Sequence, residues 1–374
     1  MNSLSWLSRI ASSLGLSLPP SSSVLTQTTD GLVLSSALDL KVKKYLKNYD
    51  STSLLVGVYR EGESTFKGYG ESPPDASSVF QIASVSKLLT TAILAVWSEQ
   101  AGIPLSRSLE ELIGDQIPLS AQAKGITLYQ LATHTSGLPR VPQVLLDKIE
   151  AAVGRHHIMD NPYHHIDERD VFDYLATTEG MRPAGQFDYS NYGMGLLAHI
   201  MERLTGQSLQ ELAKEGLLQP LNMSNTGITI DDRIRPHLIT GYDAQGNKTE
   251  PWTFNALAGA GAFYSTGQDM MAFIRANFQD SKLSASKLED SQSIAARLQL
   301  MQFSQNGVNL GWVGPSITQK MFGKHSPLWH NGLLAGYASF LAIDPEHKIS
   351  VLILSNQGRD VTSLGVDITK AVLQ

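Results

Sequence analysis

Two apolar segments near the C-terminus constrain the fold more than any other feature of the sequence. Residues 337–343 and 349–354 are apolar on both of their alternating faces. A strand of this kind belongs to a sheet that is covered on both sides. The linking residues 344–348, which include Asp344 and Pro345, form a short turn that joins the two strands as an antiparallel pair.

The opposite end of the chain supplies further strands. Residues 52–60 and 64–69 have strand patterns around a Glu-Gly-Glu turn, whereas residues 101–247 carry mostly helix and loop signals. We therefore predict an α/β (α+β) fold, in which an antiparallel sheet is built from both chain ends and flanked by helices, with an inserted helical subdomain. The expected division is an N-terminal segment and linker at 1–30 and one domain at 34–374, with an α/β part at about 34–95 and 250–374 and a helical part at about 96–249.

Periodicity and capping signals place other elements in this plan. Helices are predicted at 34–46, after residue 84, at 127–134, after the capping box at 208–211, and at 267–277, 291–303 and 361–373, and short strands at 309–313 and 328–330.

Composition excludes several classes of function. The 374 residues carry a net charge of −6, and no stripe of Lys and Arg marks a nucleic-acid partner. The chain has no cysteine, which excludes disulfides, thiolate metal sites and cysteine nucleophiles. No apolar run approaches the ~20 residues that a membrane-spanning helix needs. We predict no cofactor, because the glycine-rich residues 258–261 lack the strand-turn-helix order of a dinucleotide fold.

The first twenty residues have apolar side chains at helical spacing. The apolar region of a secretory signal carries no charge, but here Arg9 lies in the middle of it. An amphipathic helix is therefore favoured over a cleavable signal. Residues 19–29 form a linker rich in Ser, Thr and Pro. Two alternatives remain open for the helix: it docks on the protein or frays, or it makes peripheral membrane contact through residues 1–30.

A Ser-x-x-Lys motif, Ser84 and Lys87, opens a predicted helix that ends near Gly102 and Pro104. Residues three apart share one face of a helical turn, where free N–H groups and the helix dipole favour negative charge on the Ser84 oxygen. A serine hydroxyl needs a neighbouring base, and Lys87 is one if apolar neighbours such as Leu88 lower its pKa from ~10.4. The alternative is an N-cap serine beside a surface lysine.

A second motif, Tyr189-x-Asn191, lies in a polar turn that leads into a predicted helix. Such a turn can present a phenol and an amide to a cleft. A lysine ammonium nearby would lower the pKa of Tyr189, and the two groups would share protons as a coupled pair. The alternative is a buried tyrosine with a satisfied hydroxyl and an asparagine that caps the turn.

A third motif, His330-Asn331-Gly332, precedes Leu333 beside a predicted strand. Glycine lets a substrate backbone approach closely. A backbone N–H here, opposite that of Ser84, would complete an oxyanion hole. His330 could donate a hydrogen bond to a substrate carbonyl or carboxylate, or it could be a strand-end histidine without a role.

Together the three motifs resemble the Tyr-x-Asn branch of the serine β-lactamase and penicillin-binding protein superfamily. This branch contains class C β-lactamases, D-alanyl-D-alanine peptidases and β-lactamase-like esterases. The resemblance runs from about residue 34 to the C-terminus and includes the segments 131–139, 220–223, 261–266 and 310–312. It implies a cleft between the α/β part and the helical part.

The resemblance also implies a role for each motif residue. Ser84 is then the acylated nucleophile, and Lys87 and Tyr189 are the pair that handles its proton. Asn191 orients the substrate amide and Lys87. The substrate-binding residues implied are Asn191, His330, Asn331, Gly332 and Leu333, with the N–H groups of Ser84 and Leu333 as the oxyanion hole.

One departure from the family pattern affects the substrate. Class C enzymes have Lys-Thr-Gly in the third motif, whereas this chain has His330, which is mostly neutral at pH 7. We therefore predict a serine hydrolase that acts on a D-alanyl peptide, a β-lactam or a small ester, with peptidase or esterase activity favoured over efficient β-lactamase activity. The alternative is a penicillin-binding sensor or scaffold without turnover. The resemblance favours a periplasmic or membrane-associated location, and a cytoplasmic one stays open without a clear signal peptide.

Several histidines are not assigned to the reaction. The pairs His156/His157 and His164/His165, near Asp160 and Asp167, match no recognised metal-ligand spacing. We expect a loop at the cleft mouth there and no metal. His134 is expected to be structural, hydrogen-bonded beneath the active-site floor.

Overall fold

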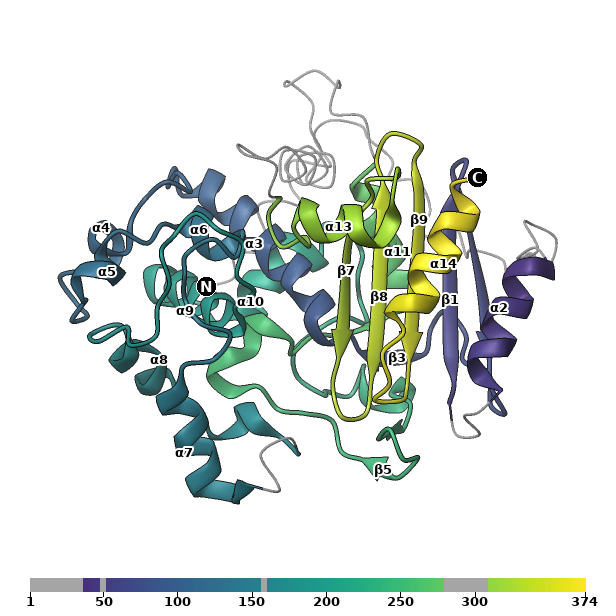
Figure 1. Cartoon of the computed structure of the whole chain (residues 1–374), viewed down its shortest axis with the longest axis horizontal. Helices are drawn as coiled ribbons and strands as arrows, with labels where there is room; N and C mark the ends of the chain where they lie inside the picture. The colour runs from purple at the N-terminus through teal and green to yellow at the C-terminus, as the bar shows by residue number, and fades with distance from the viewer. Residues whose placement is uncertain (1–35, 48–51, 156–159, 279–308) are drawn as a thin grey trace, which may run out of the picture. The chain divides into compact units, whose positions relative to one another are not determined.

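The computed structural model describes residues 36–47, 52–155, 160–278 and 309–374, and residues Leu34–Gln374 form one compact unit. Its centre is a five-stranded sheet in the order β2-β1-β9-β8-β7, with every neighbouring pair antiparallel (Figure 1). The strands are β1 (Leu54–Arg60), β2 (Glu63–Tyr69), β7 (Leu328–Leu333), β8 (Ala338–Asp344) and β9 (Ile349–Ser355). The predicted antiparallel sheet is confirmed.

Strands from early and late in the sequence pair in the middle of this sheet. Leu55 of β1 pairs with Leu354 of β9, which places a strand from residues 54–60 beside one from residues 349–355. The turn after β8 makes β8 and β9 an antiparallel pair, as their short connection predicts.

Both faces of the sheet are covered, which explains the apolar strands. Leu54 and Val56 point to one face and pack with α2 (Ser36–Leu46) and α14 (Thr362–Val372), the helix drawn in yellow against the sheet in Figure 1. Leu55 lies between them in sequence and points to the opposite face. There it joins the large core that includes α3 (Ser86–Gln100), α9 (Asn191–Thr205) and α11 (Gly267–Ala276).

The region between the sheet strands is mostly helical, as predicted. Side-chain caps start several of these helices: Thr127 and Ser208 both form capping boxes. The helices are α4 (Leu109–Ile113), α5 (Ala121–Lys124), α6 (Leu128–Ala132), α7 (Gln143–Val153), α8 (Glu168–Tyr174), α9 and α10 (Leu209–Ala213). Among the described residues, no helix has both the length and the apolarity to cross a membrane.

Shorter elements complete the described chain. They are the 3₁₀ helices Ala83–Val85, Pro162–His165, Arg235–His237 and Asn255–Ala260, the π-helix Lys214–Leu218, α13 (Pro315–Phe322), and two small sheets that pair β3 (Val79–Gln81) with β6 (Tyr264–Thr266) and β4 (Gly241–Tyr242) with β5 (Lys248–Thr249).

The predicted strand at residues 309–313 is wrong. Gly311 has φ +75°, a left-handed conformation that interrupts an extended strand. Its N–H donates to the Ala132 carbonyl, and a Cβ at this position would lie 2.5 Å from Thr91 Oγ1. The segment is therefore a turn against α3. The predicted helix at 291–303 and the N-terminal segment 1–30 lie outside the described residues.

Candidate active site

Ser84 lies on a strained turn that joins β3 to α3. The turn is the 3₁₀ helix Ala83–Val85, and Ala83 has φ 50°, a conformation that costs an L-residue roughly 1–2 kcal/mol. Two hydrogen bonds fix Ile82, the residue before this turn. Ser339 Oγ of β8 donates to the Ile82 carbonyl at 2.7 Å, and the Ile82 N–H donates to the Phe263 carbonyl at 2.9 Å. The α-helix proper begins at Ser86, two residues later than Ser84.

The Ser84 hydroxyl contacts the two residues predicted to handle its proton. Lys87 Nζ lies 3.0 Å from Ser84 Oγ. The hydroxyl of Tyr189 lies 2.8 Å from the same oxygen and donates a hydrogen bond to it. The structure thus brings the first two motifs together.

Lys87 is fully buried, and its amine has one further partner. Nζ donates to the Ala260 carbonyl at 2.5 Å, a contact that sequence reasoning missed because a backbone acceptor leaves no side-chain signal. Burial, and secondarily the positive charge of Arg140, holds the pKa of Lys87 well below its usual 10.5. This confirms the predicted direction and favours a neutral amine.

Tyr189 is held in place by the residues around it. Ser190 caps α9 by accepting from the Gly193 N–H at 2.8 Å, and the Ser190 N–H donates to His134 Nδ1 at 3.1 Å. The His134 ring also packs against the Tyr189 ring, tilted by 38° with centroids 4.7 Å apart. His134 is buried, and these contacts fit the structural role expected for it.

The pKa of Tyr189 shifts in the opposite direction to the prediction. Burial raises it above its usual value of 10, and this effect outweighs the lowering by the Ser84 hydrogen bond and the Arg140 charge. The expected lowering needed a lysine ammonium nearby, but burial disfavours that charged form of Lys87. Tyr189 is therefore a proton donor at neutral pH.

Asn191 has a partner that sequence reasoning did not identify. Its Nδ2 donates to the Tyr163 hydroxyl at 2.7 Å, and its buried Oδ1 has no partner among the described residues. Within the part of the chain described, no hydrogen bond joins Asn191 to Lys87, in contrast to the expected orientation of Lys87. Tyr163 packs against Trp252 and lies in the histidine-rich loop, where no motif drew attention to it.

The third motif forms the outer strand of the sheet, β7. Leu334 N donates to the Tyr337 carbonyl at 2.8 Å, one position beyond the pair Leu333↔Ala338. Hydrogen-bonded and non-hydrogen-bonded pairs alternate in an antiparallel ladder. The Leu333 N–H therefore points away from β8, toward the open edge of β7.

Gly332 lets β7 pack against the turn Ala83–Val85, which carries Ser84. A Cβ at Gly332 would lie 2.8 Å from the Ser84 backbone nitrogen and 2.7 Å from the Ala83 Cβ. Any larger residue would force the two segments apart. This close approach places the backbone around Leu333 next to Ser84, as an oxyanion hole requires.

His330 is buried and electrically neutral. Burial and the Lys87 charge lower its pKa to about 3. Its Nδ1 lies 2.6 Å from the Asn331 carbonyl, so Nδ1 carries the proton and donates. The buried Nε2 is then an acceptor without a partner among the described residues, in contrast to the donor suggested by the sequence.

Asn331 faces away from a substrate-binding position. Its Nδ2 donates to Thr362 Oγ1 at 2.8 Å, at the start of α14. The side chain thus links the third motif to the C-terminal helix. In this conformation the backbone of Asn331 is the part left for the predicted substrate contact.

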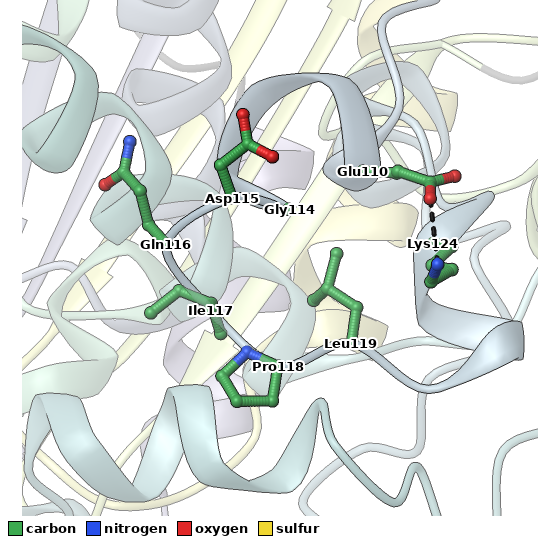
Figure 2. A pocket seen from close by; sticks show the side chains of 8 residues that line it. All are labelled: Glu110, Gly114, Asp115, Gln116, Ile117, Pro118, Leu119 and Lys124. Carbon is green, nitrogen blue, oxygen red and sulfur yellow. Dashed lines mark hydrogen bonds and ion pairs between the residues drawn. The ribbon is translucent and has the colours of Figure 1, made fainter.

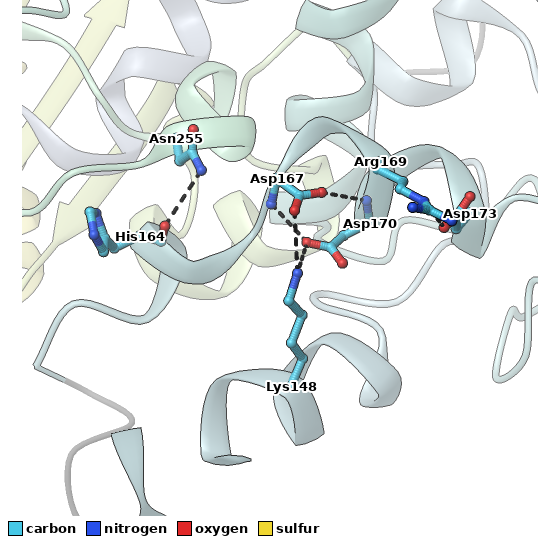
Figure 3. Close-up of polar contacts among 7 residues, drawn as sticks. All are labelled: Lys148, His164, Asp167, Arg169, Asp170, Asp173 and Asn255. Carbon is cyan, nitrogen blue, oxygen red and sulfur yellow. Dashed lines mark hydrogen bonds and ion pairs between the residues drawn. The ribbon is translucent and has the colours of Figure 1, made fainter. Parts of the chain in front are cut away.

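The histidine-rich loop is organised by capping and ion pairs (Figure 3). Asp167 caps α8 and pairs with Lys148, and the Lys148 ammonium lies 2.5 Å from Asp170. His164 Nδ1 lies 2.8 Å from Thr253 Oγ1. Within residues 36–47, 52–155, 160–278 and 309–374, no group of three or more His, Asp or Glu side chains could hold a metal ion. His156 and His157 lie outside the described residues.

A cavity of about 580 Å³ lies apart from the three motifs (Figure 2). It is lined by residues of α4, α5 and their connection, including Asp115 and the ion pair between Glu110 and Lys124. None of its lining residues belongs to the three motifs, so it adds nothing to the chemistry at Ser84.

Known proteins match the chain across most of its length. The Beta-lactamase family profile covers residues 38–373. D-alanyl-D-alanine-carboxypeptidase/endopeptidase AmpH of Escherichia coli (strain K12) is 26% identical over 81% of this chain and 79% of its own. A Beta-lactamase of Yersinia enterocolitica is 23% identical over 81% and 82%. A class C β-lactamase from Rhodobacter sphaeroides shares the fold, with a TM-score of 0.72 and 19% identity over 91% of this chain and 100% of that chain. The chain belongs to the Beta-lactamase family.

Proposed function

We propose that this protein, a serine hydrolase of the β-lactamase type, acts through an acyl-enzyme formed on Ser84. One observation carries the proposal: Ser84 Oγ lies 3.0 Å from Lys87 Nζ and 2.8 Å from the Tyr189 hydroxyl. A serine with a base and a proton donor on the same oxygen has the arrangement that nucleophilic catalysis needs.

The proton path follows from the two pKa shifts. A neutral Lys87 amine has a lone pair that can accept the Ser84 proton as Oγ attacks the acyl carbonyl. The resulting oxyanion is stabilised by the N–H groups of Ser84 and Leu333. When the bond to the leaving group breaks, the leaving atom takes a proton from Tyr189 or from the Lys87 ammonium, and the acyl group stays on Ser84.

Deacylation uses the same groups in a second cycle. A water molecule attacks the Ser84 ester and gives its proton to the Lys87 and Tyr189 pair, and Ser84 leaves with a proton restored to Oγ. The pair ends in its initial protonation state, so turnover can repeat.

The substrate proposed is a D-alanyl peptide or a small ester, with a β-lactam as a slower acyl donor. The name of the Escherichia coli relative, a D-alanyl-D-alanine-carboxypeptidase/endopeptidase, supports the peptide class. The neutral His330, with pKa about 3, supplies no positive charge at the third motif. Asn191 Oδ1 and His330 Nε2 are buried acceptors that can receive hydrogen bonds from a substrate amide.

The test is an intact-mass time course of the protein with a penicillin and with a p-nitrophenyl ester. We expect a transient adduct and released p-nitrophenol with the wild type and neither with Ser84→Ala. The matched control is Ser98→Ala, because the Ser98 hydroxyl donates to the Ile103 carbonyl at the end of α3, away from the motifs. A stable adduct without turnover would identify a penicillin-binding sensor, and turnover by Ser84→Ala would refute the nucleophile.

We also propose peripheral membrane contact through residues 1–30, on the basis of their amphipathic pattern alone. Co-sedimentation with anionic vesicles, compared between the full chain and a chain that lacks residues 1–30, tests this. Equal sedimentation of the two proteins would exclude the contact.

A further inference from the structure

Arg140 lies beside the Tyr189 ring and neither gives nor takes a proton in the mechanism proposed above. It follows Pro139 in the segment between α6 and α7, and its carbonyl accepts hydrogen bonds from the N–H groups of Asn191 and Tyr192, both at 3.0 Å. These bonds fix its backbone against the second motif. Its side chain is exposed, and its guanidinium carbon lies 5.0 Å from the centre of the Tyr189 ring.

Lys87 also lies against this ring, and Arg182 lies beside the turn that carries Tyr189. Lys87 lies 4.8 Å from the ring centre, but it is buried and donates to the Ala260 carbonyl. Arg182 pairs with Asp188 at 3.0 Å. Among the described residues, no carboxylate forms an ion pair with Arg140, so its charge stays available to a ligand.

The third motif supplies no positive charge that could bind an anionic substrate. His330 is neutral and presents an unpartnered acceptor, and an acceptor lone pair repels a carboxylate. An anionic substrate in this cleft would therefore find no favourable charge at β7. A guanidinium can bind a carboxylate with two parallel hydrogen bonds.

We propose that Arg140 binds a carboxylate of the substrate and gives this hydrolase a preference for anionic acyl donors. The inference rests on the proposed function at Ser84 and adds a substrate class and a specificity residue to it. The carboxylate belongs either to the leaving group, as at a peptide C-terminus, or to the acyl group. Both sources share the chemistry that Arg140 recognises.

A competing role for Arg140 is electrostatic. Its charge contributes to the lowered pKa of Lys87. A variant that only loses this effect would slow neutral and anionic substrates by the same factor, and its pH profile would move. A variant that loses a carboxylate contact would slow anionic substrates selectively.

The test compares paired substrates with wild type and Arg140→Gln. Diacetyl-Lys-D-Ala-D-Ala and its C-terminal amide differ in the leaving-group carboxylate, and mono-p-nitrophenyl glutarate and p-nitrophenyl butyrate differ in the acyl carboxylate. We expect Arg140→Gln to lower kcat/KM about 10- to 100-fold for the carboxylate member of one pair, and less than about fivefold for its neutral member. Arg140→Lys should restore part of the loss.

A control variant and a binding measurement separate recognition of the carboxylate from a general loss of positive charge. Arg182→Gln removes a neighbouring exposed arginine that already has a carboxylate partner, and it should leave the anionic-to-neutral ratio unchanged. A second readout needs no turnover: calorimetric binding of acetyl-D-Ala-D-Ala and of monomethyl glutarate to Ser84→Ala protein, with and without Arg140→Gln.

The outcomes are distinct. Weaker binding and a selective loss for one anionic pair support the proposal and identify which carboxylate is bound. Equal losses for neutral and anionic substrates, or no loss, overturn it while the hydrolase assignment stands. Failure of the wild type to turn over any of the four substrates would overturn the proposed function as well.

Discussion

The hydroxyl of Tyr189 lies 2.8 Å from Ser84 Oγ, although the two residues are 105 positions apart in the chain. Lys87 Nζ lies 3.0 Å from the same oxygen. A serine hydroxyl has one proton to donate and lone pairs to accept with. Ser84 can therefore donate to a neutral Lys87 while it accepts from Tyr189. The first two predictions follow from these hydrogen-bond directions.

Tyr189→Phe removes the proton donor and leaves the ring. We expect kcat to fall about 10²- to 10⁴-fold, because this is the range that a positioned acid or base contributes. Tyr174→Phe is the matched control, since the Tyr174 hydroxyl donates to the Glu179 carbonyl away from Ser84. Steady-state kinetics and thermal unfolding measure both variants. A wild-type kcat in Tyr189→Phe would leave Lys87 as the proton-handling group by itself.

The pH dependence should follow Lys87. The pKa of this amine lies well below 10.5, and only the neutral form accepts a proton, so kcat/KM should rise with pH and level off well below pH 10.5. The raised pKa of Tyr189 predicts no loss of activity from its ionisation near neutral pH, and His330, with pKa about 3, stays neutral there. The profile is measured with a neutral ester. A rate that still increases tenfold per pH unit near pH 10 would contradict a lowered Lys87 pKa.

Gly332→Ala should separate β7 from the turn that carries Ser84. The added Cβ would meet Ser84 N at 2.8 Å and Ser339 Oγ at 2.5 Å. We expect a loss of about 10²- to 10³-fold in kcat, the cost of losing one oxyanion-hole donor. Gly125→Ala is the control, because no atom lies within 4 Å of its added Cβ and its φ is −82°. Equal activity of the two variants would show that β7 contributes no donor.

Tyr163→Phe should act through Asn191. Loss of the 2.7 Å hydrogen bond frees the amide to rotate, so we expect KM to rise for amide substrates, with a loss of about 1 kcal/mol in the free energy of binding. A double-mutant cycle with Asn191→Ala measures the coupling. Additive effects of the two substitutions would show that Tyr163 does not position Asn191.

The sequence predicted the sheet well because its signals are local. Residues 349–354 are apolar on both faces, and the structure buries every residue of β9 between two layers. The capping box at Ser208 likewise starts α10 where predicted. The failures arose from backbone conformation: the apolar residues around Gly311 read as a strand, but a left-handed glycine turns the chain there.

The candidate site was predictable in its residues and in the lowered pKa of Lys87, but not in the protonation of Tyr189 and His330. Ser84, Lys87 and Tyr189 stand in recognisable motifs, and the structure brings them together. Partners such as the Ala260 carbonyl and the Tyr163 hydroxyl come from segments whose local pattern carries no sign of the site.

The sequence by itself determined which elements form and which side chains can react, because periodicity, caps and side-chain chemistry are properties of neighbouring residues. Tertiary structure alone decided that Tyr189 keeps its proton and that His330 presents an acceptor. The physical reason is that a pKa and a tautomer depend on burial and on hydrogen-bond partners, and these come from segments that only folding brings into contact.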